Sequence, residues 1–137
     1  MNRAIKTQFP PDLKKLQKKA DRLFQLGRRM QEADKNGFCE CITCKKVDHY
    51  KRMDGGHFIG KGLTGNLAVR YEKNNVWPQC KRCNLHGKGC YSIYRDELIK
   101  IVGEEEVKRL EKKKYETVIF KRELLEKVIE EWKTLKS

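Results

Sequence analysis

Apolar side chains recur at helical spacing near the start of the chain and predict one long helix over residues 11–34. Pro10 and Pro11 suit the beginning of such a helix, and Asn36-Gly37 suits its end. Most lysines and arginines of the segment fall on other faces, where they could contact a row of phosphate groups or simply be solvated. The apolar face consists of Leu13, Leu16, Ala20, Leu23, Phe24 and Met30.

Three further helices are predicted in the last third of the chain. One covers residues 91–102 and ends at Gly103, and the next covers residues 104–113, with acids in its first turn and lysines in its last. Thr117 is the expected N-cap of a last helix that extends to about residue 136. The apolar face of that helix contains Val118, Leu125, Val128, Ile129, Trp132 and Leu135.

Shorter patterns occupy the middle of the chain. Residues 47–52 are strand-like, the alternation L-A-V-R-Y over 67–71 predicts a second strand, and 75–77 leads into another extended segment. We therefore expect an α+β fold, with a small metal-stabilised core between helical arms. The length fits a single domain over 1–137. Its parts are a basic N-terminal helix (1–37), the core (38–90) and the C-terminal helices (91–137).

Two Cys-x-x-Cys pairs predict a structural zinc site, with Cys41, Cys44, Cys80 and Cys83 as the ligands. Cys39 competes for a place in the first pair, but the 41/44 spacing is the commoner one. A disulfide framework is the alternative use of the six cysteines. The first residues lack the apolar core of a signal peptide, so we expect a reducing cytoplasm and metal binding.

Charge is distributed unevenly along the chain, whose net charge is +13. Residues 1–37 and 38–90 each carry 10 Lys+Arg against 4 Asp+Glu, whereas residues 91–137 carry 12 against 11. An excess of cations in the first two-thirds favours a nucleic-acid partner over a merely solvated surface. No apolar run approaches membrane-spanning length, and no membrane partner is expected.

The central motifs resemble those of a known family. His57, Asn75 and Asn84 match the H-N-N pattern of HNH endonucleases, whose core is the ββα-metal fold. The resemblance extends further to the lambda-type phage NinG (Rap) recombination endonucleases, and it covers most of residues 19–111. It rests on K-A-D-R-L-F, C-I-T-C, G-G-H-F-I, N-V-W-P-Q-C-K-R-C-N, Y-R-D-E-L and G-E-E-E-V-K-R-L-E.

The resemblance implies a metal-dependent, structure-selective DNA endonuclease that acts on branched recombination intermediates such as D-loops and Holliday junctions in a phage-infected bacterial cell. His57 would be the general base on water, since an unperturbed histidine titrates at about 6.5. One divalent cation, Mg²⁺ or similar, would bind the scissile phosphate, with an oxygen ligand from Asn84. Asn75 would hold the loop and orient the backbone of the histidine.

The chain departs from the commoner HNH pattern immediately before the histidine. Many members have an acidic metal ligand there, and this chain has Gly56, as the NinG-like pattern does. Asp54 is the nearest carboxylate upstream and could reach the ion across two glycines. An ordinary turn aspartate is the alternative interpretation.

Five cations near the predicted site would suit DNA phosphates, namely Lys61, Arg70, Lys81, Arg82 and Lys88. Trp77 and Tyr71 could stack on unpaired bases, but the buried core is the expected place for both. For His49 and His86 we expect structural roles, although His86 is the better placed for a phosphate or metal contact.

Two other functions fit parts of the pattern. A non-catalytic zinc-stabilised nucleic-acid-binding module would explain the cysteines and the charge, but it would not need His57 and Asn84. A homing or restriction-type HNH nuclease would need a recognition domain that the sequence does not reveal. Apolar seams with seven-residue spacing in the first and last helices suggest a homodimer, which would supply two cuts at a four-way junction, although packing within one chain explains them equally well.

Overall fold

The computed structural model describes residues 10–60 and 66–134 of the chain. Helix α2 (Pro11–Glu32) is followed by a short hairpin of β1 (Phe38–Glu40) and β2 (Val47–His49), in which Cys39 pairs with Asp48. A 3₁₀ turn (Tyr50–Arg52) leads into β3 (Met53–His57). The predicted first helix is confirmed, and it ends two residues early because Ala33 is extended.

Strand β3 pairs in antiparallel fashion with β4 (Val76–Cys80), in a register that places His57 opposite Val76 and Met53 opposite Cys80. Between the two strands lie α3 (Leu67–Arg70) and a 3₁₀ turn (Lys73–Asn75). A single π-helical turn (Arg82–His86) follows β4 directly. The sheet and this turn therefore bring the second cysteine pair, Cys80 and Cys83, next to the first pair.

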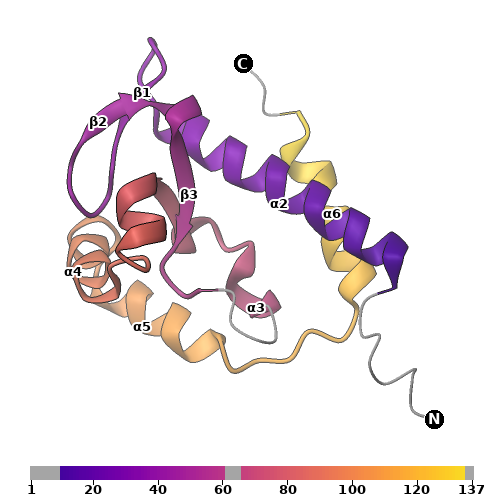
Figure 1. Cartoon of the computed structure of the whole chain (residues 1–137). Helices are drawn as coiled ribbons and strands as arrows, with labels where there is room; N and C mark the ends of the chain where they lie inside the picture. The colour runs from indigo at the N-terminus through magenta and orange to yellow at the C-terminus, as the bar shows by residue number, and fades with distance from the viewer. Residues whose placement is uncertain (1–9, 61–65, 135–137) are drawn as a thin grey trace.

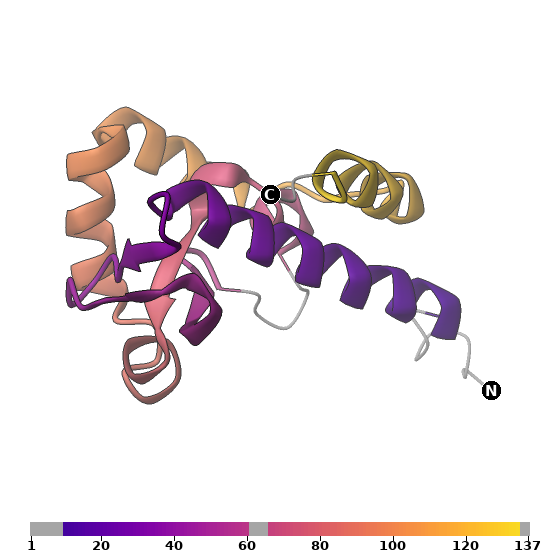
Figure 2. The ribbon, with the colours of Figure 1, turned by 90° about the horizontal axis from the view of Figure 1, so that it is seen from above.

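Three helices complete the described chain, namely α4 (Tyr91–Val102), α5 (Glu104–Lys113) and α6 (Lys121–Trp132). The first two match their predicted bounds. The last begins four residues after Thr117, with Phe120 rather than Thr117 at its N-cap position. Helix α2 runs along most of the molecule, with α6 beside one part of it and strands β3 and β4 beside the other, while α4 and α5 lie away from it (Figures 1 and 2).

The predicted strand over residues 67–71 is wrong, because these residues form the short helix α3 and its C-cap. Alternation over five residues fits one turn of helix almost as well as a strand, and tertiary contacts decide between them. Here Leu67 and Val69 are both buried, and Val69 lies in the core shared with α4 and α5. The strand predicted over 47–52 is confirmed for residues 47–49, whereas residues 50–52 form the 3₁₀ turn.

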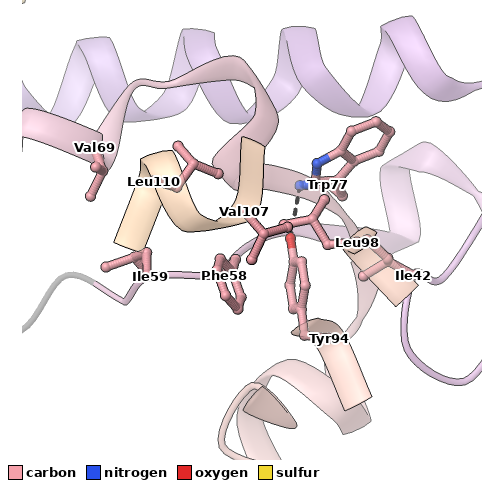
Figure 3. Packing of buried hydrophobic residues seen from close by; sticks show 9 residues of the cluster. All are labelled: Ile42, Phe58, Ile59, Val69, Trp77, Tyr94, Leu98, Val107 and Leu110. Carbon is pink, nitrogen blue, oxygen red and sulfur yellow. Dashed lines mark hydrogen bonds between the residues drawn. The ribbon is translucent and has the colours of Figure 1, made fainter. Parts of the chain in front are cut away.

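One apolar cluster lies between the strands and helices α4 and α5 (Figure 3). Tyr94 is fully buried in it, and its hydroxyl donates to Gly56 O at 2.6 Å and accepts from Trp77 N–H at 3.2 Å. This hydroxyl therefore bridges β3 and β4 one residue before His57. The cluster contains Ile42, Phe58, Ile59, Val69, Trp77, Tyr94, Leu98, Val107 and Leu110.

A second apolar cluster joins α2 to α6 and includes Ala20, Phe24, Leu125 and Val128. Trp132 packs edge-on against Phe24, with ring centroids 4.9 Å apart. These are the seams that suggested a homodimer, and in this structure they pack against each other within one chain. They therefore give no support of their own to a dimer, which stays a prediction.

Candidate metal centre and adjoining pocket

The four cysteines assigned to zinc from their spacing lie together. The Sγ atoms of Cys41, Cys44, Cys80 and Cys83 are all within 4.8 Å of one another, and those of Cys44 and Cys80 are 3.7 Å apart. Tetrahedral Zn²⁺ with thiolate bonds near 2.3 Å requires sulfur separations of about 3.8 Å. The cluster therefore fits a metal ion such as zinc, which would join the β1–β2 hairpin to the end of β4.

The surroundings of Cys41 favour its thiolate. Its Sγ accepts from the N–H groups of Cys80 at 3.3 Å and Cys44 at 3.5 Å, and it lies 3.3 Å from the hydroxyl of Thr43. Burial alone would raise the pKa of the Cys41 thiol, but these hydrogen bonds lower it to about 6. A thiol that ionises easily is ready to bind a metal at neutral pH.

Cys39 and Cys90 stay outside the cluster. Cys39 is buried in β1, and burial raises the pKa of its thiol to about 11. Cys90 is half-buried, and its Sγ lies 3.7 Å from Cys83 O. The prediction that Cys39 is not a ligand therefore agrees with the structure.

A pocket of about 350 Å³ opens beside the metal centre. Asp54 and His57 of β3, Asn84 of the π-helical turn and Lys88 line it. Helix α2 adds Gln25 to the rim. Residues that are 30 positions apart in the chain thus meet in one hollow, because β4 returns the chain alongside β3.

The imidazole of His57 is oriented by the backbone of α3. Its Nε2 lies 3.2 Å from Arg70 O. Since a carbonyl oxygen only accepts hydrogen bonds, the neutral ring carries its proton on Nε2 in this arrangement, and the lone pair is on Nδ1. The position of Arg70 is itself fixed, because its guanidinium donates to both carboxylate oxygens of Asp21 at 2.9 and 2.6 Å.

Asp54 is a strand residue whose carboxylate faces Asn84, and not part of a turn. Asn84 Nδ2 donates to Asp54 Oδ2 at 3.0 Å, and Lys81 Nζ contacts Oδ1 at 2.7 Å. Burial alone would raise the pKa of Asp54, but the hydrogen bonds from Lys81 and Asn84 and the charge of Arg29 hold it below its ordinary value. The pocket therefore contains a carboxylate at neutral pH.

Asn75 is fully buried and clamps the chain on both sides of the pocket. Its Oδ1 accepts from Ile59 N–H at 2.8 Å, and its Nδ2 donates to Ile59 O at 3.2 Å and to Val69 O at 3.1 Å. Its backbone carbonyl also accepts from Phe58 N–H at 2.9 Å. The segment just after His57 is thus fixed through one amide side chain.

The structure gives a physical reason for Gly56. A Cβ atom at this position would lie 2.1 Å from Gln79 Oε1 and 2.8 Å from Gln79 Cβ. Gln79 is fully buried and donates to Thr43 Oγ1 at 3.2 Å and to Gly89 O at 3.0 Å, so it has little room to move away. No side chain fits at position 56, and the carboxylate comes from Asp54.

The cations predicted to contact DNA divide into two groups. Lys81, Arg82 and Lys88 are exposed, whereas Arg70 is only 7% exposed and engaged by Asp21. We correct the prediction for Arg70, since burial and its bidentate ion pair commit it to the fold. Lys61 lies outside the described residues.

Two arginines of α2, which lie off its predicted apolar face, are also engaged within the fold. Arg28 is fully buried and donates through Nε to Val76 O at 2.8 Å, with its guanidinium 4.6 Å from the centre of Trp77. Arg29 donates to Tyr50 O at 2.8 Å and to Met53 O at 3.0 Å. Both fasten α2 to the strands.

The contacts of Trp77, Tyr71 and His49 agree with structural roles, whereas the role of His86 stays a prediction. Trp77 is buried, and the hydroxyl of Tyr71 donates to Asp21 Oδ1 at 2.7 Å. His49 accepts from Lys51 N–H at 3.2 Å and so caps the 3₁₀ turn. His86 is exposed at the end of the π-helical turn.

A family model described as "Bacteriophage Lambda NinG protein" matches residues 2–136. The chain belongs to the NinG family. It is 34% identical over 71 residues to Protein ninG of Escherichia phage 933W, a match that covers 52% of this chain and 34% of the relative. The corresponding protein of Escherichia phage lambda is also 34% identical over 71 residues, which is 33% of its length. The matched region thus spans about a third of these relatives, and no solved structure matched the chain.

Three residues that shape the pocket of this NinG-family chain carried no sequence signal for that role. Gln25 lies on a helix whose polar positions look alike, and Gln79 looks like an ordinary strand residue. Tyr94 could be assigned to the core by helical spacing, but not to the Gly56 carbonyl. Within residues 10–60 and 66–134, no helix has both the length and the apolar character to cross a membrane.

Proposed function

We propose that this NinG-family chain is a metal-dependent DNA endonuclease that acts on branched recombination intermediates. The observation that carries the proposal is the meeting of His57, Asp54 and Asn84 in one pocket. This set offers a base and two oxygen ligands, and the basic surface beside it suits a phosphodiester. The preference for D-loops and Holliday junctions rests on family resemblance alone.

His57 is the proposed general base. The carbonyl of Arg70 holds Nε2–H, so Nδ1 receives the proton from the attacking water. Asn75 and Tyr94 are positioning residues, because they fix the backbone on the two sides of the histidine. Neither touches the reacting atoms in this proposal.

Asp54 and Asn84 would hold the catalytic divalent cation. The donor set fits, because both side chains provide oxygen atoms, the Asp54 carboxylate is ionised, and Mg²⁺ prefers oxygen ligands. When bound, the ion would stabilise the charge on the scissile phosphate and on the leaving oxygen. Lys81 now occupies one carboxylate oxygen and would turn to a phosphate when DNA is present.

A binding module without catalysis would explain the cysteine cluster and the cations equally well. It would not require a histidine whose Nε2 is fixed on a carbonyl at the rim of a pocket that also contains a carboxylate. Catalysis explains this arrangement, and the following experiment separates the two functions.

The test compares the wild-type chain with His57→Ala on labelled four-way junction and linear duplex DNA, with Mg²⁺ or without any added divalent cation. We expect His57→Ala to slow cleavage by about 10²–10⁴-fold, the usual contribution of a general base. DNA affinity and zinc content should stay near the wild-type values.

His86→Ala is the matched control, because His86 is an exposed histidine two residues after Asn84. It should cleave at close to the wild-type rate. Cleavage by His57→Ala at the wild-type rate would refute the catalytic assignment. Absence of cleavage by the wild-type chain on both substrates would favour the binding module.

A further inference from the structure

A second hollow, of about 480 Å³, lies next to the catalytic pocket and is lined mainly by cations. We call it the basic groove. Met53 and Cys80 contribute to its lining, and Asp48 is its one acidic residue. The cations are Lys46, Lys51, Arg52, Lys81 and Arg82.

These cations come from three separate segments. Lys46 precedes β2, Lys51 and Arg52 belong to the 3₁₀ turn, and Lys81 and Arg82 lie within the second cysteine pair. Folding therefore gathers like charges that the unfolded chain would keep apart, and their repulsion opposes folding. Such an arrangement suggests an anionic ligand when the charges are not neutralised within the protein.

The neutralisation is incomplete. Asp48 binds Arg52 Nε at 2.7 Å. Arg82 lies within the second cysteine pair, next to the cluster of sulfur atoms. In the described part of the chain, neither Lys46 nor Lys51 forms an ion pair.

The basic groove continues the catalytic pocket. Met53 lines the groove and the next residue, Asp54, lines the pocket. Lys81 lines the groove while its ammonium contacts Asp54 Oδ1 at 2.7 Å. A ligand that places one phosphate beside His57 therefore has the groove within reach of the adjoining part of its backbone.

We propose that the basic groove binds backbone phosphates of DNA next to the phosphate held in the pocket. Several separated ammonium groups match a ligand with regularly repeated negative charges, since a lysine acts as a point charge that needs no fixed orientation. The choice of DNA as the ligand, and of flanking phosphates, rests on the nuclease function proposed above. Binding itself can be measured without cleavage.

The test uses the full chain with Lys46→Gln and Lys51→Gln combined, and no added divalent cation, so that DNA is bound and not cut. Fluorescence anisotropy with a labelled duplex and a labelled four-way junction gives Kd at several salt concentrations. We expect Kd to rise by about tenfold and the slope of log Kd against log salt to fall by about 2, since each phosphate contact contributes about 0.9.

The matched control combines Lys108→Gln and Lys112→Gln, two exposed lysines of α5, and changes the net charge equally. We expect its salt slope to stay at the wild-type value. If the two double variants have the same Kd and the same salt slope, with zinc content unchanged, the proposed role of the groove is refuted. If the groove double variant loses zinc, Lys51→Gln alone decides, with an expected fall in slope of about 1.

The groove proposal and the nuclease proposal can fail independently, and the experiments distinguish the two cases. If the wild-type chain never cuts DNA but its DNA binding depends on Lys46 and Lys51, the nuclease proposal is refuted and the groove is still a DNA-binding site. If the wild-type chain cuts DNA but the groove double variant binds DNA like the control variant, only the groove proposal is refuted.

Discussion

The cations of the C-terminal helices and those of the central region are used differently by the fold. In the helices, Arg95 Nε lies 2.7 Å from Glu111, and Arg109 contacts both Glu72 and Glu106. The hydrogen bond from Arg109 lowers the pKa of Glu106 to about 2. Around the cysteine cluster, by contrast, exposed lysines line two hollows that contain few carboxylates.

The two regions also differ in what holds them together. Helix α6 is attached to α2 mainly by apolar side chains such as Phe24 and Leu125. The central region also packs on an apolar cluster, and it has in addition the cysteine cluster and buried polar clamps from Asn75 and Gln79. About half of the excess positive charge therefore lies where the backbone is fixed by directional contacts, which suits a surface that must keep its shape when an anion binds.

The largest effect is expected when the metal centre is removed. Cys41→Ser should lose the bound zinc and unfold the central region, because structural zinc typically contributes on the order of 10 kcal/mol to folding. The apolar contact between α2 and α6 should survive in part. Zinc analysis of the purified chain and hydrogen exchange along its sequence measure both outcomes.

Cys39→Ser is the control for this prediction, since Cys39 is a buried cysteine outside the cluster. It should keep one zinc ion per chain. Loss of zinc from Cys39→Ser, with retention in Cys41→Ser, would show that the ligand assignment is wrong.

An intermediate effect is expected at the ion pair between Lys81 and Asp54. Lys81→Gln should bind Mn²⁺ about threefold more tightly in the absence of DNA, because the ammonium no longer competes for the carboxylate and an exposed pair is worth roughly 0.5–1 kcal/mol. The same variant should bind DNA more weakly. Calorimetric titration with Mn²⁺ and anisotropy with DNA measure the two changes.

Lys88→Gln is the matched control, because Lys88 also lines the pocket but forms no ion pair with Asp54 in the described structure. Its Mn²⁺ affinity should change less. Identical Mn²⁺ affinities for Lys81→Gln and the wild-type chain would argue against Asp54 as a ligand.

The smallest effect is expected in the C-terminal helices. Arg109→Gln removes contacts with Glu72 and Glu106 and should lower the free energy of unfolding by about 1 kcal/mol, since these carboxylates are partly exposed and screened. DNA affinity should stay close to that of the wild-type chain. Urea denaturation at neutral pH and the anisotropy assay give both values, and a tenfold loss of DNA affinity would contradict the contrast between the two regions.

Much of the helical framework could be predicted because its signals are local. The bounds of α4 and α5 follow from their apolar spacing and from Gly103 between them. The last helix begins later than predicted, since Thr117 forms no cap and the chain from 117 to 120 is not helical. Capping depends on where the chain leaves the preceding helix, which one residue type does not determine.

The membership of the pocket was partly predictable, but its contacts were not. The motif selects His57 and Asn84, which line the pocket, and the buried Asn75. The pairing of Asp54 with Asn84 instead follows from the register of β3 with β4. Gln79 explains why position 56 must be glycine, and its burial follows only from the assembled sheet. Short strands of this kind carry too little pattern to fix a register.

By itself, the sequence determined the long helix, the membership of the four-cysteine cluster and the excess of cations, because spacing and composition act over a few residues. Tertiary structure alone decided the partners of those cations. Arg70 meets Asp21 across 49 positions, and Lys81 meets Asp54 across 27. Ion pairs of such separation depend on how the helices and strands pack, and they decide which positive charges remain available to a ligand.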